Sequence, residues 1–205
     1  MSLYRQIVFS EILIFIDYFG FMAYSNYIKL FCKKSLKKLL DYFDKALVDR
    51  NQTISYSQYG EDKIILTMLD LYKVKQPKYM DIGAYHPFKF SNTALLYKNG
   101  IRGINIEPDP RQFRLFQKYR KNDINLNIGI FTEKGKIRYY QFERSEYNTF
   151  SEEASFNTVK QGIKKISEIS IDVDTYTNIV LERLNGIPPD ILFLDAEGLD
   201  FAILK

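Results

Sequence analysis

Residues 79–110 read YMDIGAYHPFKFSNTALLYKNGIRGINIEPDP, and this stretch decides the fold. It holds a short apolar strand that ends at Asp81, a helical segment at 91–100, and a second apolar strand that ends at Glu107. A strand, a helix and a strand in this order predict two parallel strands joined by a right-handed crossover. Ligands of such sheets bind beyond the carboxyl ends of the strands, so Asp81, Gly83 and Glu107 become candidate site residues.

The alternation of strands and helices continues on both sides of this unit. Further helices are expected at 60–73, from Pro110 onward and within 169–186. Asp109 would cap the helix that begins at Pro110. Further strands are expected at 124–131, at 135–142, at the start of 169–186 and before Asp195. We expect the strand at 135–142 to pair with the one at 124–131 across the turn between them. The pattern predicts an α/β fold of three layers with a mostly parallel central sheet over residues 51–205.

The spacing of glycines and acids narrows the class of ligand. Gly83 allows a tight turn because it has no Cβ. Glu107 follows 24 residues later, near the ~20-residue spacing of an acid that binds ribose hydroxyls. No glycine occurs between Gly83 and Gly100, so the cradle for a pyrophosphate is absent and NAD is disfavoured. S-adenosylmethionine has no phosphates and becomes the predicted cofactor. The alternative is a structural turn followed by a solvated glutamate.

Four segments together resemble the FkbM-type S-adenosylmethionine-dependent methyltransferases. They are SQYGED at 57–62, the stretch 79–110, NTFSEE at 148–153 and FLDAEGLDFAILK at 193–205. The resemblance implies a class I, Rossmann-like methyltransferase fold. It also implies O-methylation, often of a sugar hydroxyl, in polysaccharide or secondary-metabolite biosynthesis.

The same resemblance assigns roles to residues at the strand ends. Asp81 and Gly83 would shape the methionine end of the cofactor site, Glu107 would hold the ribose, and Asp195 would face the reacting centre. The candidate cofactor-binding residues are Gln58, Gly60, Asp81, Gly83, Ala84, Glu107, Asn127 and Asp195. Gln58 and Gly60 would fold over the cofactor as a lid, or would only cap the helix at 60–73.

The sequence also departs from the family pattern. The commoner turn is Asp-x-Gly-Ala-Asn-x-Gly, and here Tyr85 and Pro87 replace the asparagine and the second glycine. The chain stops after what resembles the fourth core strand of a sheet that has seven in this fold class. The expectation is therefore a C-terminally incomplete methyltransferase domain with an exposed edge strand. A non-catalytic cofactor-binding or assembly module, and an enzyme that uses a nucleotide sugar, are the alternative functions.

Three residues are candidates for catalysis. His86, the only histidine, lies in the loop after the first strand, where a pKa near ~6.5 suits a general base, although it could simply bond a nearby carbonyl. Asp195 and Glu197 could deprotonate a hydroxyl, bind Mg²⁺ or cap the helix that follows. No metal site is predicted.

Composition bounds the remaining choices. With 29 basic and 25 acidic residues scattered along 205, the chain lacks the charge pattern of a nucleic-acid binder. A single cysteine, Cys32, favours a reducing, cytoplasmic setting.

The first 50 residues differ in composition from the rest and predict a helical N-terminal extension. Aromatic and lysine-rich residues over 7–38 favour either packing on the domain or a partner chain, or peripheral contact with an anionic membrane. The aromatic N-terminus and the exposed edge strand together predict a homo-oligomer.

Overall fold

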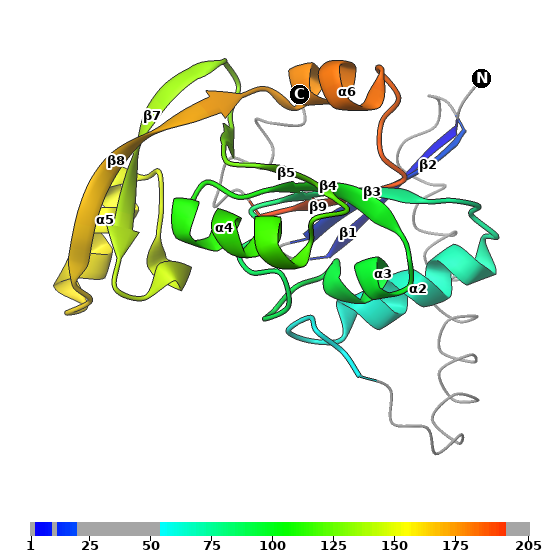
Figure 1. The fold of residues 1–205 in the computed structure, drawn as a ribbon, viewed down its shortest axis with the longest axis horizontal. Helices are drawn as coiled ribbons and strands as arrows, with labels where there is room; N and C mark the ends of the chain where they lie inside the picture. The colour runs from blue at the N-terminus through cyan, green and yellow to red at the C-terminus, as the bar shows by residue number, and fades with distance from the viewer. Residues whose placement is uncertain (1–2, 10–11, 20–53, 196–205) are drawn as a thin grey trace. The chain divides into compact units, whose positions relative to one another are not determined.

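A four-stranded parallel sheet forms the centre of the fold (Figure 1). The structure is a computed structural model, and it describes residues 3–9, 12–19 and 54–195. The strand order is β5-β4-β3-β9, where the strands are β3 (Lys78–Ile82), β4 (Arg102–Ile106), β5 (Ile124–Leu126) and β9 (Ile191–Leu194). All three pairings are parallel, so the predicted α/β fold with a parallel sheet is confirmed. Strand β9 is an edge of this sheet among the described residues, and self-association through it stays a prediction.

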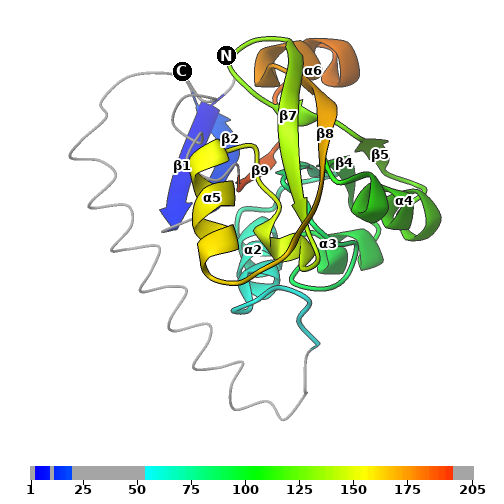
Figure 2. The same cartoon turned by 90° about the vertical axis from the view of Figure 1, so that its left-hand side faces the viewer.

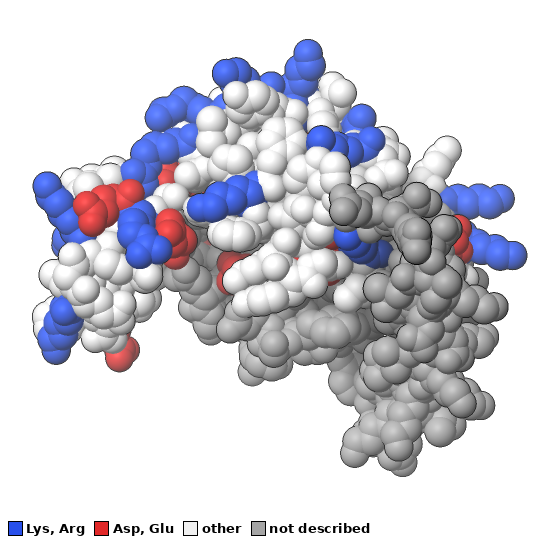
Figure 3. All heavy atoms as spheres, turned by 90° about the horizontal axis from the view of Figure 1, so that it is seen from below, with Lys and Arg blue, Asp and Glu red and all other residues white. Residues whose placement is uncertain are grey.

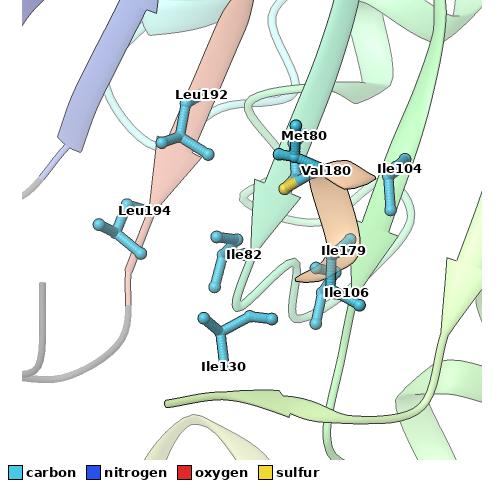
Figure 4. Close-up of a cluster of buried hydrophobic side chains, with 9 residues drawn as sticks. All are labelled: Met80, Ile82, Ile104, Ile106, Ile130, Ile179, Val180, Leu192 and Leu194. Atoms are coloured by element: carbon cyan, nitrogen blue, oxygen red, sulfur yellow. The ribbon is translucent and has the colours of Figure 1, made fainter. Parts of the chain in front are cut away.

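One face of the sheet packs against helix α6 (Tyr176–Leu184). Alternate residues of β3, β4 and β9 point to this face and form a buried apolar cluster with Ile179 and Val180 of the helix, shown in Figure 4. The strand residues of the cluster are Met80, Ile82, Ile104, Ile106, Leu192 and Leu194. A parallel sheet with crossover helices buries both faces, which explains why these strands read as continuous apolar runs.

The opposite face carries the helix that precedes β3 and the two helices that connect β3 to β4 and β4 to β5. These are α2 (Glu61–Leu71), α3 (Ala94–Lys98) and α4 (Pro110–Tyr119), and Figure 1 and Figure 2 place them across the sheet from α6. Asp109 caps α4 by accepting a hydrogen bond from the Arg111 amide, with Pro110 in the first turn, as the sequence predicts. Helices therefore lie on both faces of the parallel sheet.

A second, three-stranded sheet corrects one sequence prediction. The segment 124–131 splits into β5 and β6 (Gly129–Ile130), which belong to different sheets. Strand β7 (Gly135–Phe142) pairs antiparallel with β8 (Lys165–Asp174), and β6 pairs parallel with β8, so β7 does not pair with 124–131.

The physical reason for the split lies at Asn127. Its side-chain amide donates to the backbone oxygens of Glu107 (2.8 Å) and Pro108 (2.9 Å), which ends β5 at Leu126. A two-residue β6 offers few ladder bonds, whereas β8 runs along the whole of β7. The connection from β7 to β8 holds the 3-10 turn η1 (Ser145–Tyr147) and helix α5 (Glu152–Lys160), and α5 lies beside the long strands in Figure 2.

The N-terminal segment also differs from expectation where it is described. Strands β1 (Leu3–Phe9) and β2 (Ile12–Phe19) form a two-stranded sheet in place of the expected helix. The β-branched and aromatic residues of this segment suit strands at least as well as a helix, which explains the error. The rest of the predicted extension, the boundary near residue 50 and most of the 7–38 segment lie outside the described residues. In the described part of the chain, no helix has the length and apolar character needed to cross a membrane.

Candidate functional site

Four of the predicted site residues come directly after strand residues that pair with one another across the sheet. Ile82 of β3 pairs with Ile106 of β4 and with Leu194 of β9, and Ile106 pairs with Leu126 of β5. The next residues along the four strands are Gly83, Glu107, Asn127 and Asp195. The register therefore brings these predicted residues to the same end of the sheet.

A cavity of about 810 Å³ opens at this end of the sheet. Its volume lies within the roughly 300–1,000 Å³ that is typical of small-molecule sites. Both sheets contribute walls, since Ile82, Glu107 and Leu194 lie on one side and Phe131 and Tyr139 on the other. A ligand in the cavity would contact the strand ends of the first sheet and the side chains of the second.

Gly83 is required at its position by a close approach of the chain. Its φ is 77°, and a Cβ added there would lie 2.3 Å from the backbone oxygen of Asp195. The amides of Gly83 and Ala84 both donate to the oxygen of Ile106, at 3.0 and 3.1 Å. The turn is thus held between β4 and the end of β9, and a side chain cannot be accommodated without moving one of them.

Glu107 is a buried carboxyl at the bottom of the cavity. It is 4% exposed, and its two oxygens accept hydrogen bonds from the amides of Tyr85 and Asp109, each at 2.7 Å. Burial raises its pKa to about 8, although the two amides act in the opposite direction. A ligand hydroxyl that donates to Glu107 would add a further hydrogen bond to the carboxylate and so favour its ionised form.

Asp81 is the second buried carboxyl of the cavity. It is 6% exposed, and its Oδ2 accepts a hydrogen bond from the Thr93 hydroxyl at 2.7 Å. Its pKa is raised to about 6, chiefly by burial, with Asp195 acting in the same direction and Thr93 and Arg120 acting against it. A cationic ligand would favour the ionised form of Asp81.

The candidates for catalysis have different surroundings. Asp195 lines the cavity as an exposed carboxylate, and its amide donates to Ile82 at 3.1 Å. Glu197 lies outside the described residues. His86 is not among the residues that line the cavity, and its Nδ1 accepts from the amides of Phe88 (3.1 Å) and Lys89 (2.9 Å).

Those contacts give His86 a clear structural role. An imidazole nitrogen that accepts two amides holds the loop after β3 in place, and burial lowers the pKa of the ring. Catalysis by His86 stays a hypothesis that this geometry does not support.

The remaining predicted cofactor residues divide into two groups. Gln58 and Ala84 line the cavity. Gly60 and Asn127 do not: Gly60 is the N-cap residue of α2, and Asn127 bonds the backbone after β4. These two residues position the lining segments without reaching the ligand space.

Sequence reasoning missed the carboxylate that anchors the segment before α2. Asp62 is fully buried and accepts from the Ser55 hydroxyl and the Tyr56 amide, both at 2.7 Å, and from the Ser57 hydroxyl at 3.0 Å. This network fixes the segment that brings Gln58 and the exposed Tyr59 to the cavity. The motif SQYGED contains the acid, but nothing local to it indicates burial.

Asp109 is a second residue whose full role was missed. Only its helix cap was predicted, yet its buried carboxylate also accepts from Arg111, from Gln141 of β7 (3.1 Å) and from Asn148 (2.8 Å). It therefore joins the first sheet to the second across the cavity wall. Gln141 and Asn148 lie 32 and 39 residues away along the chain, so only the tertiary structure shows these two contacts.

The charge of the lining is one-sided. Six acidic side chains line the cavity, and no Lys, Arg or His does so within residues 54–195. The acids are Glu61, Asp81, Glu107, Asp109, Glu146 and Asp195. Basic side chains occupy several separate places on the surface seen in Figure 3. No cluster of three or more His, Cys, Asp or Glu suited to a metal ion occurs in the described part of the chain.

A family model for the methyltransferase FkbM domain matches residues 81–205, more than half of the chain. The chain belongs to the FkbM methyltransferase family. Membership implies an S-adenosylmethionine-dependent methyltransferase with a Rossmann-like fold, and the parallel sheet agrees with that fold. Nothing among curated proteins or solved structures matches the chain significantly.

The cavity of this FkbM chain suits S-adenosylmethionine in its chemistry. Buried carboxyls at Asp81 and Glu107 complement a sulfonium, an ammonium or ribose hydroxyls, and Ile106 and Ile128 offer apolar surface for a purine. A phosphorylated cofactor would place its negative charge beside these acids. The lining therefore agrees with the cofactor that the family implies.

Proposed function

We propose that this FkbM methyltransferase transfers a methyl group from S-adenosylmethionine to a sugar hydroxyl in polysaccharide or secondary-metabolite biosynthesis. Bound at the strand ends, the cofactor supplies an electrophilic methyl group on a sulfonium. The observation that carries the proposal is the position of Asp81, Glu107 and Asp195 around one cavity. Family membership supports methyl transfer. The sugar acceptor is the one that the resemblance implies, and the lining of the cavity supports it.

The two buried carboxyls would bind different parts of the cofactor. Glu107, at the end of β4, would accept hydrogen bonds from the ribose hydroxyls, while its present bonds from Tyr85 and Asp109 fix its orientation. Asp81 would lie beside the positively charged methionine end. The amides of Gly83 and Ala84 hold the turn after Asp81 against Ile106, the residue before Glu107, and both acids line the same cavity.

The second sheet supplies an acceptor side with mixed chemistry. Phe150 packs against Phe131 and Tyr139, with ring centroids 5.2 and 4.6 Å apart, and Ser145 and Glu146 line the cavity as well. An aromatic surface next to hydroxyl and carboxylate groups suits the apolar face and the polar rim of a sugar ring.

Asp195 is our candidate for the base. Deprotonation of a hydroxyl needs an acceptor within hydrogen-bond reach of it, and Asp195 is the exposed carboxylate at the end of β9. Positioning the hydroxyl in line with the methyl group can supply roughly 7–11 kcal/mol of the barrier.

Isothermal titration with S-adenosylhomocysteine tests the cofactor part of the proposal. We expect the wild-type chain to bind and Glu107→Ala to lose at least tenfold in affinity, because the ribose hydroxyls would lose a charged hydrogen-bond acceptor. Glu182→Ala, at an exposed position of α6, is the matched control and should bind like wild type. A folded wild-type chain without affinity would contradict the proposal.

Transfer from methyl-labelled S-adenosylmethionine tests the acceptor part. Oligosaccharides should become labelled, and Asp195→Asn should reduce turnover at least a hundredfold with little change in cofactor affinity. Cofactor binding with no label on any glycan would contradict the sugar acceptor while leaving the cofactor site intact.

A further inference from the structure

A fully buried arginine lies behind the cavity wall. Arg120, which follows the last turn of α4, is 0% exposed and pairs with Asp123 at 3.0 Å. Its guanidinium also donates to the Tyr79 hydroxyl, to the Pro87 oxygen at 3.1 Å and to the Thr93 hydroxyl at 3.2 Å. Pro87 lies within the loop that joins β3 to α3, so the arginine contacts that loop as well as the side chains of Tyr79 and Thr93.

The hydrogen-bond direction through Thr93 is fixed by chemistry. A guanidinium can only donate, so the Thr93 oxygen accepts from Arg120. The single hydroxyl hydrogen of Thr93 is then free for the Oδ2 atom of Asp81 at 2.7 Å, whereas Ser91 lies farther away at 3.4 Å. A permanent cation thereby polarises a hydroxyl that donates to a carboxyl of the cavity.

We propose that Arg120 is a positioning residue for cofactor binding. Through the Thr93 hydroxyl it orients the Asp81 carboxyl at the cavity wall, and through the Pro87 oxygen it holds the middle of the loop between β3 and α3. The inference rests on the proposed cofactor site, and it adds a residue that does not line the cavity.

The pKa of Asp81 reports the contribution of the Thr93 hydroxyl, because that hydroxyl is one of several groups that act on the same carboxyl. From the elements packed around it, Asp195, Asp123 and Glu107 face Asp81 with like charge, and burial also disfavours its ionised form. Thr93 and Arg120 act against these effects. Loss of the hydroxyl should therefore raise the pKa of Asp81.

Two substitutions at Thr93 separate the hydroxyl from the shape of the side chain. Thr93→Val keeps the shape and removes the hydroxyl, whereas Thr93→Ser keeps the hydroxyl. Substitution of Arg120 by an apolar residue would leave Asp123 as a buried unpaired charge, so the threonine gives the cleaner test. Thr158→Val, at a buried threonine of α5, is the control for folding.

The Asp81 carboxyl can be titrated by ¹³C NMR without any ligand. We expect Thr93→Val to raise the pKa by about one unit, and Thr93→Ser and Thr158→Val to leave it close to wild type. Arg120→Lys, which keeps the charge but not the planar set of donors, should shift the pKa in the same direction. An unchanged titration in Thr93→Val, or an equal shift in Thr93→Ser, would overturn the inference.

Binding of S-adenosylhomocysteine supplies the second measurement. Thr93→Val should weaken binding about tenfold in the wild-type background and have no further effect in the Asp81→Asn background. Additive losses would show that Thr93 acts independently of Asp81 and would overturn the inference. Absence of binding by the wild-type chain would instead refute the proposed cofactor site, and the NMR titration would still decide the role of Arg120.

Discussion

At the scale of single residues, the site contains two carboxyls whose burial lowers the stability of the fold when they are ionised. Asp81 and Glu107 are buried at the strand ends, and burial raises the pKa of Asp81 to about 6 and that of Glu107 to about 8. Both values lie above those of the unfolded chain. Between the pKa of each group in the unfolded chain and its pKa in the folded chain, the folded state binds more protons than the unfolded state. The stability of the fold therefore falls as the pH rises through that window.

Glu107→Gln should separate this stability cost from the binding role. Between about pH 6 and 8 the wild-type chain should lose thermal stability as Glu107 ionises, and the glutamine variant should show a flatter profile and a higher Tm at about pH 8. Thermal unfolding across this range measures the difference. An identical pH profile for the two proteins would show that the buried carboxyl does not carry the effect.

Gly83 gives a second prediction at this scale. Gly83→Ala must move either the turn or the end of β9, because the added Cβ meets the Asp195 oxygen. We expect the unfolding free energy to fall by about 2 kcal/mol or more and cofactor binding to be lost. Gly135→Ala, where an added Cβ meets nothing within 4 Å, is the matched control. Urea denaturation of both variants provides the comparison, and equal stability would contradict the close approach.

At the scale of elements, the sequence predicted the features of helices and strands that depend on neighbouring residues. The proline after Asp109 gave the correct start of α4, and the apolar runs gave the ends of β3 and β4 to within one residue, because caps and buried parallel strands depend on neighbouring residues. The partner of β7 was predicted wrongly, since strand pairing depends on segments far apart in sequence. The contacts of Asp109 and Arg120 were missed for the same reason.

Asp109 provides the prediction for the joined sheets. Asp109→Ala removes the helix cap and leaves buried donors of Gln141 and Asn148 without their acceptor, which should cost about 2–4 kcal/mol in unfolding free energy. Chemical denaturation measures the loss. Asp172→Ala, at an exposed ion pair of β8, should cost less than ~1 kcal/mol, and similar losses at the two positions would contradict the assigned role.

At the scale of the whole molecule, a chain of net charge +4 presents a cavity lined by acids. Four strand ends of the site were predictable, because parallel strands end together at one edge. The aromatic wall from the second sheet was not predictable, since no local pattern places Phe131, Tyr139 and Phe150 opposite those strand ends. The charge contrast between the lining and the chain is likewise a property of the fold.

That contrast predicts selectivity among nucleotide-like ligands. S-adenosylmethionine and S-adenosylhomocysteine should bind, whereas NAD and UDP-sugars should bind at least a hundredfold more weakly, because their phosphates would face the acids of the lining. Competition titrations in the absence of divalent metal measure these affinities. Comparable binding of a UDP-sugar would favour the nucleotide-sugar alternative.

Hydrogen–deuterium exchange with and without S-adenosylhomocysteine tests the central claim most directly, because it locates the ligand as well as detecting it. The account predicts slower exchange at residues 81–85 and 107–109, which form the turn after β3 and the amides that bond Glu107, with no change in α6. Protection confined to other segments, or none at saturating ligand, would contradict a cofactor site at the carboxyl ends of β3 and β4.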